Sequence, residues 1–407
     1  MWYAICNLLV VLSFFLSTYL TLRQRKTILR ATEPPKIFKD KITDEKFQKE
    51  KAYQTDKINF ALLQSVISFF LVLFKVKFIG TFWNFFNYGG EIIHSLIFLD
   101  VFDVIGTIID LPFSYYSTFV IEEKYGFNKS TKKLWVTDIL KSQAISLILT
   151  DILVPIIIFI FRKAGAKSVY IIQIVLVIIQ LIMQVIYPIL ILPLFTKLTR
   201  ITEGPAFEGI NKLCEETKFN AKEVYSADDS KRTNHTNAMV FGLFTKKIAF
   251  ADKFLEDPKV DQLVAIIAHE IGHSKHWHIF KQFIISQIQF AIFFNVLYMF
   301  MSTDSIFIEF GVEDKPFIIG MFLFGILMSP IETLLDLPMN MLSRHFEYQA
   351  DSFAAERNLP IDLALIDLAT DNMDTIDDDP LYSAFTSSHP TIPQRVEAAR
   401  AIMKKKE

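Results

Sequence analysis

Seven long apolar runs constrain the fold of this chain more than any other feature of its sequence. They occupy residues 2–22, 58–74, 92–120, 144–161, 169–195, 279–301 and 317–341. A helix that crosses the hydrocarbon core of a bilayer needs about 20 predominantly apolar residues, and each run is close to that length or longer. The sequence therefore predicts a mostly α-helical, polytopic membrane protein with seven transmembrane helices.

The first apolar run has a second interpretation, because a cleaved signal peptide is also apolar. A signal peptide has a basic segment ahead of the apolar run and a cleavage site of small residues behind it. Neither feature is present around residues 2–22. We therefore expect this run to be a retained membrane helix.

The charges between the runs predict the orientation of the helices. Residues 23–57 contain eleven Lys and Arg residues, and residues 124–141 contain five more. Positively charged loops remain on the cytoplasmic side of a membrane. Counting crossings from these loops places the N-terminus outside or in a lumen. Residues 196–278 and the tail after residue 343 then share the cytosolic side, so the two largest polar segments should meet.

We divide the chain into four parts on this basis. Residues 1–195 hold transmembrane helices 1–5, residues 196–278 form a cytosolic domain, residues 279–342 hold transmembrane helices 6 and 7, and residues 343–407 form a C-terminal segment. The formal net charge is −2, so no basic field favours nucleic acid as a partner. The two cysteines make neither a disulfide framework nor a cysteine-rich metal site.

Polar residues inside the apolar runs have two interpretations. They can form hydrogen bonds between helices, or they can line a hydrated cavity that the helices enclose. The sequence leaves both open. The residues concerned are Asp100, Asp103, Asp110, Asp151, Gln173, Gln180, Gln184, Asn295 and Glu332.

The motif that carries chemistry is HExxH, formed by His269, Glu270 and His273 in a segment with helical apolar spacing. Residues four apart lie on the same face of a helix, so the two imidazoles can bind one Zn²⁺. Glu270 lies one step round the helix, where it can act as the base for the attacking water. This pattern is that of a metalloprotease.

A catalytic zinc site needs a third protein ligand and one open position. Glu347 is the best candidate, because it follows the last apolar run and therefore lies on the cytosolic side. Asp351, four residues later, lies on the same helical face and can hold the outer nitrogen of a ligating histidine. Glu332 is weaker because it lies within an apolar run. His276 and His278 follow the motif too closely to be third ligands, and we interpret them as membrane-interface residues.

Four further segments accompany HExxH along the chain. They are FVIEEKYGFN at 119–128, KRTNHTNAMVFG at 231–242, SRHFEYQAD at 343–351 and SSHPTIPQR at 387–395. Together, in this order, these motifs and the seven apolar runs resemble the integral-membrane zinc CAAX prenyl endopeptidases. The resemblance covers nearly the whole chain.

The resemblance implies a fold and a cofactor. The helices would form a barrel around a large hydrated chamber, with a gluzincin-type zinc metalloprotease domain facing the cytosol. One Zn²⁺ per chain would be bound by His269, His273 and Glu347. The segment before the HExxH helix reads as a small β-hairpin, with strands at 238–244 and 246–250.

The resemblance also implies a substrate and further site residues. Prenylated CAAX proteins would lose their C-terminal aaX tripeptide, and some family members cut farnesylated precursors a second time upstream. Asn237 matches the family's substrate-contacting Asn, and the hairpin suits β-augmentation by an extended peptide. His389 and Arg395 match residues expected to bind substrate or stabilise the developing oxyanion. His235 is a further candidate for this group.

The tail suggests a location. Lys404 and Lys405 resemble a dilysine retrieval signal, which a receptor reads only on the cytosolic side. We therefore expect a multi-pass protein of the endoplasmic reticulum or nuclear envelope, with a cytosolic C-terminus. The oligomeric state stays open.

Two other functions also stay open. One is a membrane quality-control protease that acts on unprenylated, misfolded proteins. The other is a non-hydrolytic factor that clears stalled translocation substrates. Cleavage of unprenylated proteins would favour the first, and function without the base Glu270 would favour the second.

Overall fold

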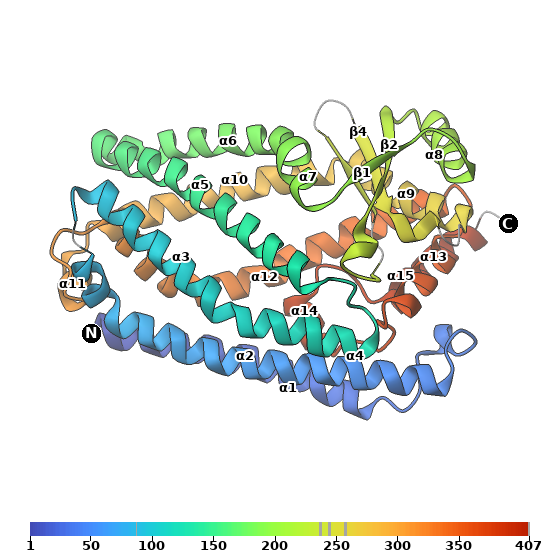
Figure 1. The fold of residues 1–407 in the computed structure, drawn as a ribbon, viewed down its shortest axis with the longest axis horizontal. Coiled ribbons are helices and arrows are strands. Elements are labelled where there is room, and N and C mark those ends of the chain that lie inside the picture. Colours follow the sequence, from blue (N-terminus) through green and yellow to red (C-terminus); the bar gives the residue numbers. More distant parts are fainter. Residues whose placement is uncertain (87, 236–237, 243–245, 256–258, 406–407) are drawn as a thin grey trace.

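The computed structural model describes residues 1–86, 88–235, 238–242, 246–255 and 259–405. Seven long helices dominate the described residues (Figure 1). Their bounds are α1 Trp2–Arg30, α2 Asp44–Phe85, α3 Glu91–Tyr116, α5 Lys132–Ala164, α6 Ser168–Ile186, α10 His278–Met301 and α12 Phe317–Ala355.

Shorter elements connect the long helices and form the polar part of the molecule. Those of the helical part are the π-helices η2 Ser117–Glu122 and η4 Tyr187–Ile191, with α4 Glu123–Tyr125, α7 Leu192–Phe195 and α11 Asp304–Glu309. Those of the polar part are β1 Leu198–Ile201, α8 Pro205–Glu216, β2 Ala221–Ala227, β3 Ala238–Phe241, β4 Lys246–Ala251, α9 Val260–Lys275, α13 Ile361–Asp371, α14 Pro380–Thr386 and α15 Ile392–Lys404. Single 3₁₀ turns lie at Lys36–Phe38, Gly165–Lys167, Asp229–Lys231 and Asp252–Leu255.

The number of membrane-spanning segments is close to the predicted seven. Six helical segments of the described residues are long and apolar enough to cross a membrane. One of them, Lys132–Phe195, contains both α5 and α6, which turn back on each other at Gly165–Lys167 and pack side by side (Figure 1). The predicted count of seven spans is therefore approximate. It is reached when α5 and α6 are counted as two separate spans.

Several helices extend beyond the apolar runs. The 42 residues of α2 span about 63 Å at 1.5 Å per residue, about twice the thickness of a bilayer's hydrocarbon core. In the same way, α12 continues without a break from the last apolar run to Ala355. The boundary that we placed between residues 342 and 343 therefore lies inside a helix.

Segments that the charge pattern assigns to opposite sides of the membrane lie at opposite ends of the molecule. The N-terminus lies beside α11 at one end, and the sheet, α8, α9, α13 and α15 lie at the other (Figure 1). The N-terminal amino group lies 2.6 Å from Glu309 of α11. Arg162, a basic residue at that same end, pairs with Glu91 at 2.6 Å.

A four-stranded sheet of order β1-β2-β4-β3 supports the polar end. β2 and β4 are parallel, whereas β1 and β3 pair antiparallel with β2 and β4 respectively. Two antiparallel strands are therefore present where the hairpin was predicted, with β3 at one edge of the sheet and Ala238 opposite Phe250. Residues 243 and 244 of the predicted first strand lie outside the described residues. β3 also lies against α9, so this edge lies next to the HExxH helix.

Each end of the molecule has its own large hydrophobic core, and a smaller cluster forms around Tyr53, Tyr125 and Phe127. The core of the polar end packs α8, α9, α13 and α15 against the sheet and the C-terminal part of α12. The second large core lies at the other end, among α1, α2, α3, α5, α6, α10, α11 and α12. In the most apolar stretches of the membrane helices only 6–33% of the residues are buried. Most side chains there are therefore at least partly exposed at the surface of the described residues.

Some intramembrane polar residues form hydrogen bonds between helices, and some line a pocket. Gln287 of α10 bonds to both Gln173 and Gln180 of α6, and Gln143 of α5 donates to Asp103 of α3 at 2.5 Å. These are hydrogen bonds between helices. Asp103 also lines an open pocket of about 540 Å³ between α3 and α5, together with Asp110. The larger enclosed chamber stays a prediction.

Candidate metal centre

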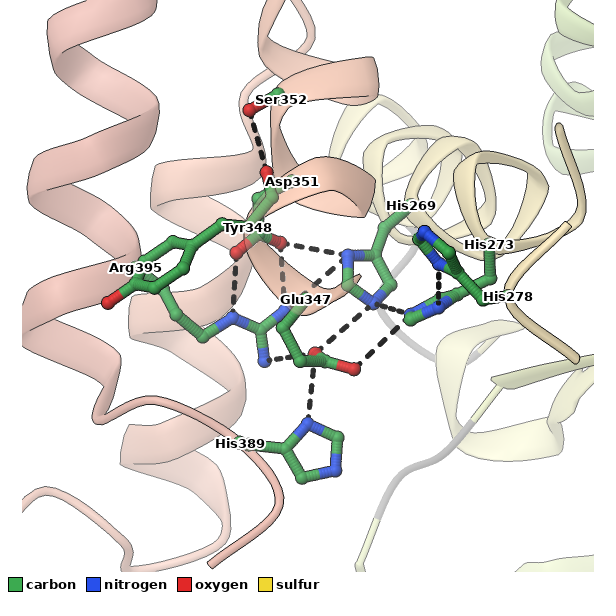
Figure 2. A network of polar contacts seen from close by, with 9 residues as sticks. All are labelled: His269, His273, His278, Glu347, Tyr348, Asp351, Ser352, His389 and Arg395. Atoms are coloured by element: carbon green, nitrogen blue, oxygen red, sulfur yellow. Dashed lines mark hydrogen bonds and ion pairs between the residues drawn. The ribbon is translucent and has the colours of Figure 1, made fainter. Parts of the chain in front are cut away.

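The HExxH motif lies on α9, and its glycine allows this helix to approach α12 closely. A Cβ atom on Gly272 would lie 3.0 Å from the Cα of Ala350 and 3.0 Å from the Cβ of Phe353. Such contacts are shorter than ordinary van der Waals separations. His269 and His273 project from α9 toward Glu347 of α12 (Figure 2). Gly272 therefore allows the close spacing of α9 and α12 that brings the histidines of the motif to Glu347.

Three side chains converge on one point between these helices. The Nε2 atoms of His269 and His273 lie 3.0 Å apart. The carboxylate of Glu347 contacts both rings: its Oε1 lies 3.3 Å from His273 Nε2, and its Oε2 lies 3.6 Å from His269 Nε2. A tetrahedral site with bonds of 2.0–2.1 Å has ligand-to-ligand edges of about 3.3–3.4 Å. The three donors therefore fit a single Zn²⁺, and they are the one such group among the described residues.

The outer nitrogen of His269 is held by a buried carboxylate. His269 Nδ1 lies 2.8 Å from Asp351 Oδ1, so the ring presents Nε2 to the centre. Arg395 holds both oxygens of Asp351 with two 2.8 Å hydrogen bonds. Burial alone would lower the pKa of Arg395, but its hydrogen bonds and charge attraction to Asp351 raise that pKa overall. Arg395 therefore stays charged, and its NH1 also lies 3.3 Å from Glu347.

The interpretation of His278 as a membrane-interface residue is wrong, because its side chain is buried inside the protein. It is the first residue of α10, and its side chain turns back toward His273 rather than outward to lipid (Figure 2). Its Nδ1 lies 2.9 Å from His273 Nδ1, and its Nε2 lies 2.8 Å from Gln349 Oε1. His276 lies over the ring of His278, with centroids 5.5 Å apart. The pattern of apolar residues around His278 does not reveal this inward direction.

Glu270 is half-buried beside the three donors. Its carboxylate forms no hydrogen bond to any other described residue, so it is available to a small molecule. Burial raises the pKa of Glu270 above that of an ordinary glutamate, while the charges of His269 and His273 oppose the rise. A carboxylate in this position can accept a proton and later release it.

His389 lies beside the carboxylate of Glu347. Its Nδ1 is 2.9 Å from Glu347 Oε2, and most of its side chain is exposed (Figure 2). The loop that carries it, residues 387–391, is fixed at its far end by a capping box in which Thr391 and Gln394 satisfy each other's backbone. The structure thus brings both residues of the SSHPTIPQR motif to the centre, with Arg395 buried and His389 accessible.

His235 lies apart from the three donors. Its Nδ1 is 3.1 Å from Asn372 Oδ1, its Nε2 is 3.5 Å from Glu122 Oε2, and its ring stacks on Phe127 at 4.2 Å. None of its contacts among the described residues is with the metal-binding group. Asn237, which we assigned to substrate contact, lies outside the described residues.

The segment before β3 is attached to the membrane part of the molecule. Thr233 pairs antiparallel with Asn128, and the backbone N–H of Asn234 donates to Phe127 at 3.0 Å. Glu122 accepts a 2.7 Å hydrogen bond from Tyr53 of α2. Glu122 and Asn128 belong to the FVIEEKYGFN motif, and the sequence alone indicates no role for either residue. The contacts of Asn128 hold Thr233 against the segment that follows η2.

We expect Gly272→Ala to weaken the centre by forcing α9 and α12 apart. Overpacking of this kind costs about 1–3 kcal/mol, so the melting temperature and the zinc affinity of the purified protein should both fall. Gly325→Ala is the matched control, because Gly325 lies in α12 with no atom within 4 Å of the added Cβ. Alanine also favours a helix, so this control should melt no lower than the wild type. Wild-type melting of Gly272→Ala would contradict the close approach.

Comparison with known proteins agrees with this architecture. A family model described as the CAAX prenyl protease N-terminal region, with five membrane helices, matches residues 24–197, and the model of peptidase family M48 matches residues 207–403. The CAAX prenyl protease 1 homolog of Arabidopsis thaliana is 36% identical, over 96% of this chain and 95% of the relative. CAAX prenyl protease 1 of Saccharomyces cerevisiae is 32% identical, over 100% of this chain and 96% of the relative. The crystal structure of S. mikatae Ste24p superimposes with a TM-score of 0.93 at 32% identity, covering 98% of this chain and 99% of that one.

Proposed function

The chain belongs to the CAAX prenyl proteases of peptidase family M48, and we propose that it uses one zinc ion to remove the aaX tripeptide from prenylated CAAX proteins. Membership of this family makes it a membrane metalloprotease. The observation that carries the proposal is the convergence of two imidazole nitrogens and one carboxylate, whose ligand atoms all lie within 4.8 Å of one another.

We assign the zinc-binding role to His269, His273 and Glu347. Zinc bound by these side chains would polarise the scissile carbonyl and make a water molecule more acidic. Asp351 holds His269 with its Nε2 toward the ion, and Arg395 holds Asp351. Such supporting hydrogen bonds fix the ring orientation and make the ligand more basic.

Glu270 is the proposed general base and acid. It takes a proton from the attacking water and delivers it to the nitrogen of the leaving amine. No covalent bond between enzyme and substrate is needed. His389 is exposed beside Glu347, so it can donate a hydrogen bond to the carbonyl oxygen as negative charge develops. Arg395 is buried behind Asp351, and we assign it a supporting role rather than contact with substrate.

The substrate would bind as an added strand. β3 forms an edge of the sheet and lies against α9, so a peptide paired with this edge would pass in front of the metal centre. Pairing with the backbone of β3 would fix the position of the peptide, and this pairing does not depend on the side chains of the peptide. The prenyl chain would add affinity, at about 0.8 kcal/mol for each CH₂ that is buried. We propose Asn237 and His235 as residues of this region, the first in substrate contact and the second in support of the strand.

We place the protein in the endoplasmic reticulum or nuclear-envelope membrane, with the metal centre in the cytosol. The basic residues of 23–57 and 124–141 support the orientation. Prenylation makes a cytosolic protein bind membranes, so its substrates would meet a membrane enzyme whose centre faces the cytosol. A second upstream cleavage of farnesylated precursors is part of the same proposal.

We expect the purified protein to cleave a farnesylated CAAX peptide after the prenylated cysteine and to leave the unmodified peptide largely intact. A zinc chelator should abolish cleavage, and added Zn²⁺ should restore it. Mass spectrometry of the products, with both peptides and with and without chelator, measures all of this. Equal cleavage of the unmodified peptide would favour a quality-control protease, and full activity in chelator would refute the zinc mechanism.

A further inference from the structure

We infer that His278 and Gln349 position the zinc ligand His273, an inference that rests on the proposed function. The two histidines of the HExxH motif have different support. Asp351 holds His269, whereas a second imidazole, that of His278, holds His273 (Figure 2). Each ligand therefore has its own supporting residue, and the two supports come from different helices.

The proton positions follow from the ligand role of His273. A histidine that binds a metal through Nε2 carries its proton on Nδ1. His273 must therefore donate from Nδ1 to His278 Nδ1, which lies 2.9 Å away and has to be unprotonated. The proton of neutral His278 is then on Nε2, from which it is donated to Gln349 Oε1 at 2.8 Å. One tautomer of His278 and one orientation of the Gln349 amide satisfy both of these hydrogen bonds.

The surroundings of His278 hold its ring in this orientation. Only 1% of the residue is exposed, and its ring stacks on Phe346 with centroids 4.1 Å apart at an angle of 10°. The turn that precedes it places Trp277 in the left-handed region, at φ 59°. A bulky residue rarely adopts that conformation. Here it connects α9 to α10 and brings the side chain of His278 against that of His273.

His278 and Gln349 are thus positioning residues, because they fix the ring plane and the tautomer of His273. Gln349 lies on α12, the same helix that carries the third proposed ligand, Glu347. A polar role and a packing role for His278 make opposite predictions for two variants. His278→Phe keeps the aromatic ring against Phe346 but removes the acceptor. His278→Asn keeps an acceptor near the position of Nδ1 but removes the ring.

The test measures zinc affinity by chelator competition, together with the absorption spectrum of the cobalt-substituted protein. Loss of a supporting residue of this kind weakens metal affinity about 10–100-fold, and we expect that loss for His278→Phe, with an altered cobalt spectrum. His278→Asn should bind zinc more tightly than His278→Phe. Because His278→Phe could fail to fold, Gln349→Leu and Gln349→Glu provide a second pair, in which only the leucine variant lacks the acceptor and should lose affinity.

The outcomes separate this inference from the proposed function. Wild-type affinity in His278→Phe or Gln349→Leu, or weaker binding by His278→Asn than by His278→Phe, overturns the positioning role while the zinc mechanism stands. A wild-type protein that binds no zinc overturns both. Reduced affinity with restored binding in His278→Asn and Gln349→Glu supports the positioning role, since a loss of packing would not be restored by these acceptors.

Discussion

Replacing Glu347 with alanine is expected to remove bound zinc and peptidase activity together. Glu347 supplies the only carboxylate of the three converging donors, and two imidazoles from one helical turn leave the ion without its third protein ligand. The loss of affinity should exceed the roughly 10–100-fold that loss of a supporting residue costs. Metal analysis of the purified variant, beside cleavage of a farnesylated CAAX peptide, measures both effects.

Glu332→Ala is the matched control for this prediction. Glu332 lies earlier on the same helix, α12, and sequence reasoning considered it as an alternative ligand. Its side chain is exposed and takes no part in the metal-binding group of the described residues. Full zinc content and activity are therefore expected after its removal. If Glu347→Ala retained one zinc per chain while Glu332→Ala lost it, the assignment of the third ligand would be wrong.

The sequence predicted those parts of the site that depend on local spacing or on the side of the membrane. HExxH needs one helical turn, so His269 and His273 follow from the pattern alone. Glu347 lies 74 residues further along the chain, and its assignment rested on its position after the last apolar run. The structure gives this position a physical basis, because α12 continues as one helix from the membrane to Ala355. Orientation and helix continuity therefore carry information across long separations.

The sequence did not predict side chains whose role depends on packing between distant segments. His278 begins an apolar helix, and hydropathy cannot distinguish a residue that faces lipid from one that turns back into the protein. The left-handed turn at Trp277 decides this direction, and no residue in the turn is a glycine that would signal it. His235 is a similar case, since its contacts come from Glu122 and Asn372. Neither pairing leaves a local pattern.

Replacing Glu270 with glutamine is expected to stop cleavage while zinc stays bound. Glutamine has nearly the same shape but cannot accept the proton of the attacking water, and general acid–base catalysis contributes about 10²–10⁴-fold to rate. A fall of that size in kcat is expected on the farnesylated peptide, with KM little changed. Zinc content should equal that of the wild type, because Glu270 is not among the converging donors. The same preparation therefore separates loss of chemistry from loss of metal, which Glu347→Ala cannot do.

The glutamine variant also decides between hydrolytic and non-hydrolytic functions. A factor that clears stalled translocation substrates without cutting them needs the fold and the membrane helices but not the base. In cells that lack the endogenous protein, Glu270→Gln should therefore fail to restore maturation of prenylated CAAX proteins, although it is present in the membrane at the wild-type level. Normal turnover of a prenylated CAAX peptide by this variant would refute the proposed proton transfer, because no other carboxylate among the described residues lies free beside the three donors.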